Sequence, residues 1–297
     1  MSSYSGFKKL RKSKKFNQTF GIVIKWIIAV FLIVFSVFPL VWIISASFNP
    51  ASTLATQTLI PRNPGLDNYK FLLGNPVFPY FKWLWNSIKI TTISTILTLS
   101  LTTMAAYAFS RFRFKGRRAM LKGILLIQVF PNLLSIVALF LILTQFGSII
   151  EQIGLDTHLG LIIVYLGGAM GMNIWLMKGY MDTIPRDIDE SARVDGATDW
   201  QIFTRLILPL LRPILVVIGL LTFIGTYGDF ILARTLLKSN EQYTVMVGLQ
   251  IYTSGMFSQK WGPFAAGALI SALPIMIIYF LLQDQIIGGL TRGAVKG

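Results

Sequence analysis

Acidic side chains, which can serve as proton donors, metal ligands or charged contacts, gather in one segment of this chain. Residues 178–212 hold half of the twelve Asp and Glu residues in the sequence. These acids are Asp182, Asp187, Asp189, Glu190, Asp195 and Asp199. Asp187, Asp189 and Glu190 follow Pro185, which suits the first turn of a helix, and carboxylates stabilise the positive amino end of a helix. The segment is therefore predicted to begin a short acidic helix.

Gly196 and Thr198 predict a turn between this helix and a second one. Gly196 can end the first helix in a left-handed conformation. Thr198 can cap the next helix, with Gln201 as its capping-box partner. The second helix is expected to run through residues 200–206 before Pro209. Such a helix–turn–helix exposes acids and a few apolar side chains, and could dock into a groove on a partner. An ordinary solvated loop with the same caps remains an equal alternative.

The residue types needed for most other chemistry are scarce. The chain has no Cys and one His, His158, which excludes disulfides, thiolate metal sites and histidine clusters. The phosphate-binding pattern G-x-x-x-x-G-K-[ST] is absent, so this chain is not a P-loop ATPase. We therefore predict no catalytic residue, no metal site and no cofactor in this chain.

The elements that position the acidic segment are membrane spans. The chain of 297 residues is 54% hydrophobic and only 13% charged, whereas soluble domains have about 25% charged residues. A span needs about 20 apolar residues. Six segments meet this requirement: Trp26–Phe48, Asn86–Ala108, Gly123–Leu143, Leu159–Met177, Ile214–Gly228 extended from Leu206 to Leu232, and Phe264–Leu282. The predicted fold class is an all-α polytopic membrane protein with six transmembrane helices.

The basic residues predict how these spans are oriented. Lys and Arg number 27 against 12 Asp and Glu. They concentrate before the first span and in the connections that follow the second and fourth spans, which places both termini in the cytoplasm. This distribution is a topology signal, so we expect no nucleic-acid partner. The predicted organisation is a basic tail at 1–25, a first span at 26–48, an external loop at 49–85, a five-helix core at 86–283 with the cytoplasmic loop 178–212, and a tail at 284–297.

Two further features bear on the class of membrane protein. A secondary transporter would need acids or cation sites inside the spans, and the cores of the spans lack carboxylates. Tyr80, Phe81, Trp83 and Trp85 cluster before the second span, and we expect them to anchor it at the membrane interface.

The acidic segment resembles the EAA loop of ABC-transporter permeases, whose pattern is E-A-A, three residues, G, nine residues and I-x-L-P. This chain reads Glu190-Ser191-Ala192, then Gly196, then Leu206-Ile207-Leu208-Pro209. The spacing matches throughout. Ser191 and Leu206 are mild departures from the pattern.

A longer resemblance, to MalG-type permeases of maltose/maltodextrin ABC importers, covers nearly the whole chain. It is carried by runs such as FPNLLSIVALF at 130–140, WLMKGYMDTI at 175–184 and WGPFAAGALISALPI at 261–275. It implies a type I ABC importer permease fold in the cell membrane, acting by alternating access on maltose, maltodextrin or a related oligosaccharide. A permease for another sugar and, more remotely, a secondary transporter remain alternatives. It also implies a MalF-like sister permease, two ATPase subunits that bind ATP and Mg, an extracellular sugar-binding protein and surrounding lipid.

The resemblance also implies roles for individual residues. Glu190 would contact a basic residue of the ATPase, Gly196 would permit the sharp turn, and Pro209 would start a rigid continuation into the fifth span. The remaining coupling residues are Ser191, Ala192, Asp195, Leu206 and Leu208. Residues that could line a sugar pathway are Gln128, Asn132, Tyr227 and Asp229. Asp229 could equally mark the water interface.

Overall fold

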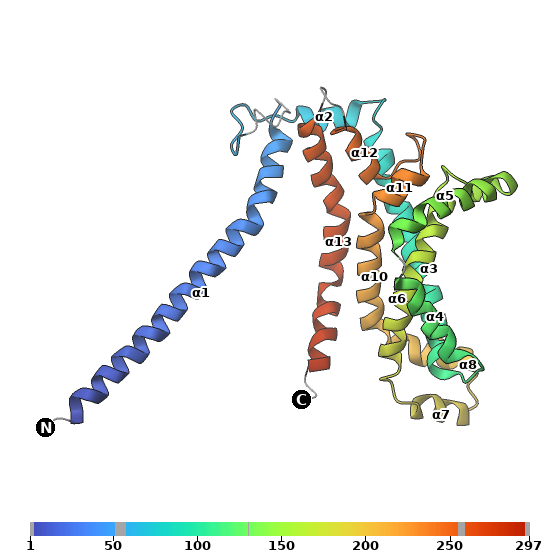
Figure 1. Cartoon of the computed structure of the whole chain (residues 1–297), viewed down its shortest axis with the longest axis horizontal. Coiled ribbons are helices and arrows are strands. Elements are labelled where there is room, and N and C mark those ends of the chain that lie inside the picture. Colours follow the sequence, from blue (N-terminus) through green and yellow to red (C-terminus); the bar gives the residue numbers. More distant parts are fainter. Residues whose placement is uncertain (1–2, 51–57, 130, 255–258, 295–297) are drawn as a thin grey trace.

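The computed structural model describes residues 3–50, 58–129, 131–254 and 259–294, with side chains outside the description at 3–20, 132–133 and 286–294. Every regular element in this described part of the chain is a helix (Figure 1). The external loop predicted at 49–85 is therefore described only in part, and it contains the short helix α2, Asp67–Gly74.

Four helices are long and apolar enough to cross a membrane. They are the apolar part of α1 (Ser3–Phe48), α3 (Tyr80–Arg111), α6 (His158–Met181) and the first 25 residues of α13 (Trp261–Ala294). Two bent pairs of helices meet the same criteria, which brings the total to six if each pair counts as one span. This agrees with the predicted number of spans.

The first bent pair occupies the third predicted span. Helix α4 (Arg117–Val129) and helix α5 (Asn132–Ile149) meet at 105°. Pro131, which caps α5 in an extended conformation, lies between them. Proline has no backbone N–H and clashes with the preceding turn. The segment Gly123–Leu143 is therefore a bent element, as a proline inside a predicted span allows.

The second bent pair occupies the fifth predicted span. The chain turns by 75° between residues 199–210 and α10, Arg212–Tyr227. Pro209 was expected to start a rigid continuation into this span, but it lies in the last turn before the bend. Pro213 instead lies in the first turn of α10. Backbone N–H groups in the first turn of a helix have no acceptor within the helix, so a proline loses no hydrogen bond there. At its other end the span stops at Tyr227, before the predicted Leu232.

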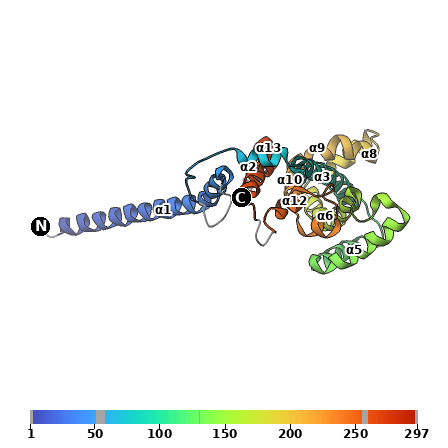
Figure 2. The same ribbon diagram turned by 90° about the horizontal axis from the view of Figure 1, so that it is seen from above.

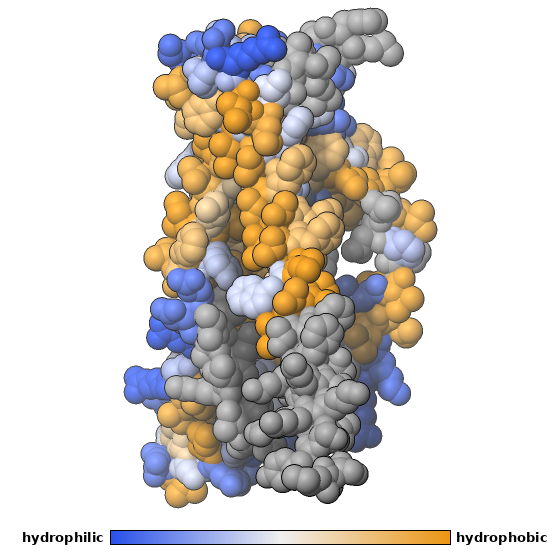
Figure 3. Space-filling view, turned by 90° about the vertical axis from the view of Figure 1, so that its left-hand side faces the viewer, coloured by the Kyte–Doolittle hydropathy of each residue, from blue (hydrophilic) through white to orange (hydrophobic). Residues whose placement is uncertain are grey.

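Helix α1 extends away from the other helices (Figure 1, Figure 2) and contacts only α13 and α2 extensively within the described chain. It includes both the predicted basic tail and the first predicted span, with no break between them. Its apolar side chains are exposed from Ile22 to Ile44. Hydrophobic residues form a broad band on this face, with hydrophilic residues above it (Figure 3). The band fits a surface covered by lipid or by another membrane protein.

The centre of the fold is α3, which packs along α6 and α10. Its buried face carries a row of hydroxyl residues, namely Thr91, Ser94, Thr98 and Thr102. Small residues allow helix backbones to approach closely in a membrane. The hydroxyl of Thr102 donates to the carbonyl of Thr98 at 2.6 Å, within its own helix. Close packing along this face thus goes with the bond of Thr102 to the backbone of its own helix, whereas the hydroxyls of Ser94 and Thr98 have no hydrogen-bond partner among the described residues.

The start of α3 is covered by the connection that follows α10. This connection holds α11 (Ile231–Leu236) and α12 (Val245–Ile251). Tyr80 and Trp83 are fully buried beneath it, and the indole of Trp83 donates to the carbonyl of Asn240 at 2.7 Å. The prediction that these aromatics anchor at the interface is therefore wrong for Tyr80 and Trp83. Of the four, Phe81 and Trp85 are exposed.

We expect Gly248→Ala to destabilise the protein, because it disrupts the packing of α12 on Trp83. A Cβ atom at Gly248 would lie 2.0 Å from the ring of Trp83, which is fully buried and has no space to move. Overpacking of this kind costs about 1–3 kcal/mol. Gly179→Ala is the matched control, because a Cβ atom there meets nothing within 4 Å. Thermal unfolding in detergent should show a lower midpoint for Gly248→Ala only, and equal midpoints would contradict the packing described here.

Candidate coupling and translocation sites

The acidic segment forms a helix–turn–helix module, residues 182–211. Its first helix, α7, spans Asp187–Val194 and carries three acids in its first turn. Glu190 and Ser191 are exposed, whereas Ala192 faces inward. Ala192 packs in a buried cluster with Met181 and Ile202. The module therefore presents Glu190 outward and uses the neighbouring Ala192 to hold the helix in place.

The turn that follows is fixed by the caps that the sequence predicted. Gly196 has φ +82°, a left-handed conformation that glycine adopts at little cost. Ala197 N–H donates to the carbonyl of Ala192 at 2.9 Å, and Gly196 N–H donates to that of Arg193 at 3.0 Å. This pair of bonds is the Schellman motif that ends many helices. Thr198 and Gln201 then form the predicted capping box of the second helix.

The second helix changes its winding along its length. It starts as α8 (Asp199–Gln201), continues as the π-helical η2 (Ile202–Ile207) and ends as α9 (Leu208–Leu210). Ile202 and Phe203 form the buried inner face of this helix. Leu206 and Pro209 are exposed and Leu208 is half-buried.

The outer face of the module combines acidic and apolar groups. Val194 is 87% exposed and Trp200 is 63% exposed. Asp195 and Leu206 line a small recess beside Gly196. Exposed apolar side chains next to carboxylates are typical of a surface that meets another protein.

A buried ion pair joins the module to the membrane-spanning core. Nε of Arg111, at the end of α3, lies 2.8 Å from Oδ2 of Asp189, and both side chains are 4% exposed. The contact has the distance of an ion pair without the alignment of a hydrogen bond. Burial raises the pKa of Asp189, and the positive charges of Arg111, Arg193 and Arg186 oppose that shift.

Hydrogen bonds on both sides of the ion pair tighten the same junction. Nη2 of Arg111 donates to the carbonyl of Ile184 at 3.1 Å, and Nη2 of Arg186 donates to that of Ser110 at 2.9 Å. The hydroxyl of Ser110 donates to Asp182 at 2.6 Å. Burial acts to raise the pKa of Asp182, but hydrogen bonds from Lys178 and Ser110 outweigh it and lower that pKa. The end of α3 and residues 182–189 therefore form one polar junction.

A cavity of about 1170 Å³ lies between the bent α4–α5 element, α6, α10 and α11. Its lining is mostly apolar, with a few polar groups. Tyr165 Oη donates to Asp229 Oδ2 at 2.8 Å, and Asn173 Nδ2 donates to Thr222 Oγ1 at 3.2 Å. An apolar cavity with a few placed polar groups has the composition of a site for a small molecule.

The residues predicted to line a sugar pathway differ in their positions. Gln128 and Asp229 line this cavity. Asp229 also accepts a bond from Ala233 N–H at 3.0 Å, so it caps α11 as well. Tyr227 is buried elsewhere, where its hydroxyl donates to the carbonyl of Ser271 at 2.9 Å. The side chain of Asn132 lies outside the described residues.

Sequence reasoning missed Tyr165, Asn173 and Thr222 as cavity residues. Asn173 could have been noticed, because it is an amide within a predicted span that has no charge. Tyr165 and Thr222 carried no comparable signal, since tyrosine and threonine are common in the other spans as well.

Comparisons with known proteins agree with this architecture. Residues 99–288 match the family described as binding-protein-dependent transport system inner membrane component. The chain is 44% identical over 274 residues to the maltose/maltodextrin transport system permease protein MalG of Vibrio vulnificus, covering 88% of this chain and 91% of that protein. It is 40% identical over 284 residues to the galactooligosaccharides transport system permease protein GanQ of Bacillus subtilis, covering 95% and 98%.

A solved structure gives the same result. A bacterial ABC transporter involved in the import of the acidic polysaccharide alginate contains a chain that superposes with a TM-score of 0.76 at 25% identity. The match covers 90% of this chain and 96% of that chain. The protein thus belongs to the family of binding-protein-dependent transport system inner membrane components, and it is a permease subunit of an ABC importer whose ATPase is a separate subunit.

Proposed function

We propose that this permease carries maltose, maltodextrin or a related oligosaccharide into the cell by alternating access. Its similarity to permeases named for maltodextrin and for galactooligosaccharides supports an oligosaccharide as substrate. The observation that carries the proposal is the cavity between the α4–α5 element, α6 and α10, in which Gln128, Asn173 and Asp229 offer hydrogen-bonding groups. Sugar hydroxyls bind to such groups in pairs of donors and acceptors.

The proposal includes partners that supply what this chain lacks. A MalF-like sister permease would complete the pore, two ATPase subunits would bind ATP and Mg, and an extracellular binding protein would deliver the sugar. Both termini would lie in the cytoplasm with the module. The start of α1 and the end of α13 lie toward the same side of the molecule as α7 (Figure 1), which supports this orientation.

The module at 182–211 is proposed to be the site where the ATPase docks. Its exposed Glu190, Val194 and Trp200 offer a charged contact and an apolar one on the same surface. The Arg111–Asp189 pair would pass the movement of α7 directly to α3. Movement could also pass from α9 into α10, but the chain turns by 75° there. We therefore expect α3 to receive the larger share of the movement of the module.

The sugar assignment is tested by uptake into proteoliposomes that contain the whole importer. Labelled maltodextrins should accumulate on addition of ATP, whereas raffinose-type sugars should not. Asp229→Asn should lower uptake about tenfold, because a hydrogen bond to a charged group contributes about 1.5–3 kcal/mol. Tyr227→Phe is the control, since Tyr227 lies outside the cavity lining. Accumulation of raffinose instead would assign another sugar, and equal losses in both variants would exclude the cavity as the pathway.

Gly196→Val should uncouple ATP hydrolysis from transport. A valine at φ +82° is strained by about 1–3 kcal/mol, so the turn between α7 and α8 would open. Gly196→Asn should retain most coupling, because asparagine tolerates the left-handed conformation. The measurement is the number of sugars imported per ATP hydrolysed, with membrane insertion checked separately. Normal transport by Gly196→Val would refute the docking proposal.

Replacing only one residue of the Arg111–Asp189 pair should lower the free energy of unfolding. Arg111→Leu or Asp189→Leu alone leaves a buried charge without its partner, which costs about 3–5 kcal/mol. Both substitutions together should restore most of this stability, because an apolar pair can replace a buried ion pair. The double variant should still import less sugar per ATP than the parent, since the polar junction is lost. Single variants as stable and as well coupled as the parent would show that the pair has no such role.

A further inference from the structure

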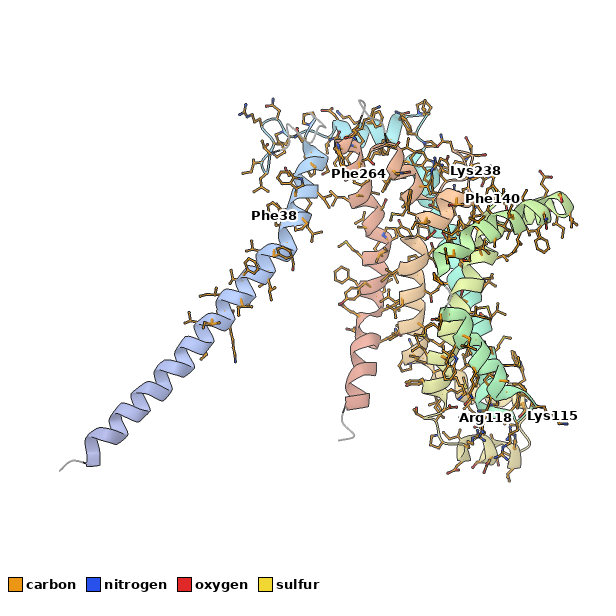
Figure 4. All side chains as sticks on the ribbon, in the orientation of Figure 1. Phe38, Lys115, Arg118, Phe140, Lys238 and Phe264 are labelled. Carbon is orange, nitrogen blue, oxygen red and sulfur yellow. The ribbon has the colours of Figure 1, made fainter. Side chains whose placement is uncertain are left out.

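A recess of about 620 Å³ lies where the α3–α4 connection meets the start of the module. Four arginines line it: Arg113, Arg117, Arg118 and Arg186. The other lining residues are Phe114, Gly116 and Ala119, so no carboxylate faces the recess. Arg118 and the adjacent Lys115 lie near α7 at the end of the molecule (Figure 4).

Two of these four arginines act on carboxylates only at longer range, Arg186 on Asp189 and Arg117 on Asp182. Within the described part of the chain, none of them forms an ion pair within 4 Å. Arg117 and Arg186 are held by backbone carbonyls, those of Phe112 at 3.3 Å and Ser110 at 2.9 Å. The nearby acid Asp182 is already bonded to Lys178 and Ser110. Like charges gathered in one recess repel one another, and an anion placed between them would relieve that repulsion.

The geometry around the recess also favours an anion. Gly116, with φ +84°, makes the turn that brings Arg117 to the start of the 13-residue helix α4. The free N–H groups at a helix start add positive potential. Guanidinium groups match the oxygens of a phosphate with pairs of parallel hydrogen bonds. The recess therefore suits a phosphate group better than a single small anion.

The surroundings of the recess favour a lipid as the molecule that would carry such a phosphate group. The apolar span of α3 ends at Arg111, so the recess lies immediately beyond the membrane-spanning part. Phe112, Phe114 and Met120 are 38%, 40% and 54% exposed beside it. A free phosphate or nucleotide would make no use of these apolar side chains, whereas a lipid would. Basic pockets between helices on the cytoplasmic side are known to hold anionic headgroups.

We propose that this recess binds the headgroup of an anionic phospholipid of the cytoplasmic leaflet. The arginines come from two parts of the chain, because Arg113, Arg117 and Arg118 lie in the α3–α4 connection and the first turn of α4, whereas Arg186 precedes α7. A bound headgroup would bridge these segments and hold the module against α4. The proposal relies on the cytoplasmic orientation proposed above, but it does not depend on which sugar is carried.

The test measures lipid retention directly, so that it is independent of transport. The whole importer is reconstituted in nanodiscs of phosphatidylcholine with phosphatidylglycerol, extracted, and analysed for bound lipid by native mass spectrometry. The variant Arg113→Gln with Arg118→Gln removes two lining charges and leaves the two backbone-bonded arginines in place. Its control, Lys115→Gln with Lys122→Gln, removes two charges from the same region outside the recess lining.

We expect the arginine variant to retain at least about tenfold less phosphatidylglycerol than the lysine variant, as lost hydrogen bonds to a charged phosphate imply. Equal losses in the two variants would show only general surface attraction and would overturn the proposal. Displacement of the lipid by inorganic phosphate would also overturn the proposal. So would an arginine variant that loses the ATPase subunits but retains as much lipid as the parent. Arg118→Gln alone, expected to show a smaller loss in the same direction, serves if the double variant does not assemble.

Discussion

The ion pair between Arg111 and Asp189 is the constraint on which the module and its junction with α3 depend. It joins the last residue of α3 to the first turn of α7, in a place with almost no solvent. A buried charge without its partner is costly, so neither residue can leave the junction alone. The module therefore cannot tilt as a whole without either moving the end of α3 or separating two buried charges.

The bend at Leu211 makes this constraint more important. A straight helix from Trp200 into α10 would have carried a push along its axis. The chain instead turns by 75° between α9 and α10, and the turn is preceded by a π-helical segment. Such segments often occur at functional sites. In the proposed coupling, movement would then pass sideways, through the buried side chains of Ile202, Phe203 and Ile207 and through the polar junction, into α6 and α3.

Local features of this module were predictable from sequence, and distant ones were not. Gly196, Thr198 and Gln201 predicted the turn and its caps because a cap depends on residues three or four positions apart. The burial of Trp83 was missed because the carbonyl that it bonds to lies 157 positions away. The bend near Leu211 was missed because hydropathy measures how apolar a segment is and not its direction, whereas Pro131 inside its span already allowed a kink. Nothing in the spacing of Arg111 and Asp189 indicated that they would meet.

The cavity shows how a permease could pass a sugar without holding it. Its main polar groups already bond to one another, Tyr165 to Asp229 and Asn173 to Thr222. A sugar entering the cavity would exchange these bonds for its own, so that the net gain is only about 0.5–1.5 kcal/mol for a neutral hydrogen bond, and larger only for a bond to Asp229. Passage needs binding that is favourable enough to admit a solute and weak enough to release it. In the proposed pathway, polar groups that bond to one another would meet both needs, because they would keep hydrogen-bond partners before the sugar arrives and after it leaves.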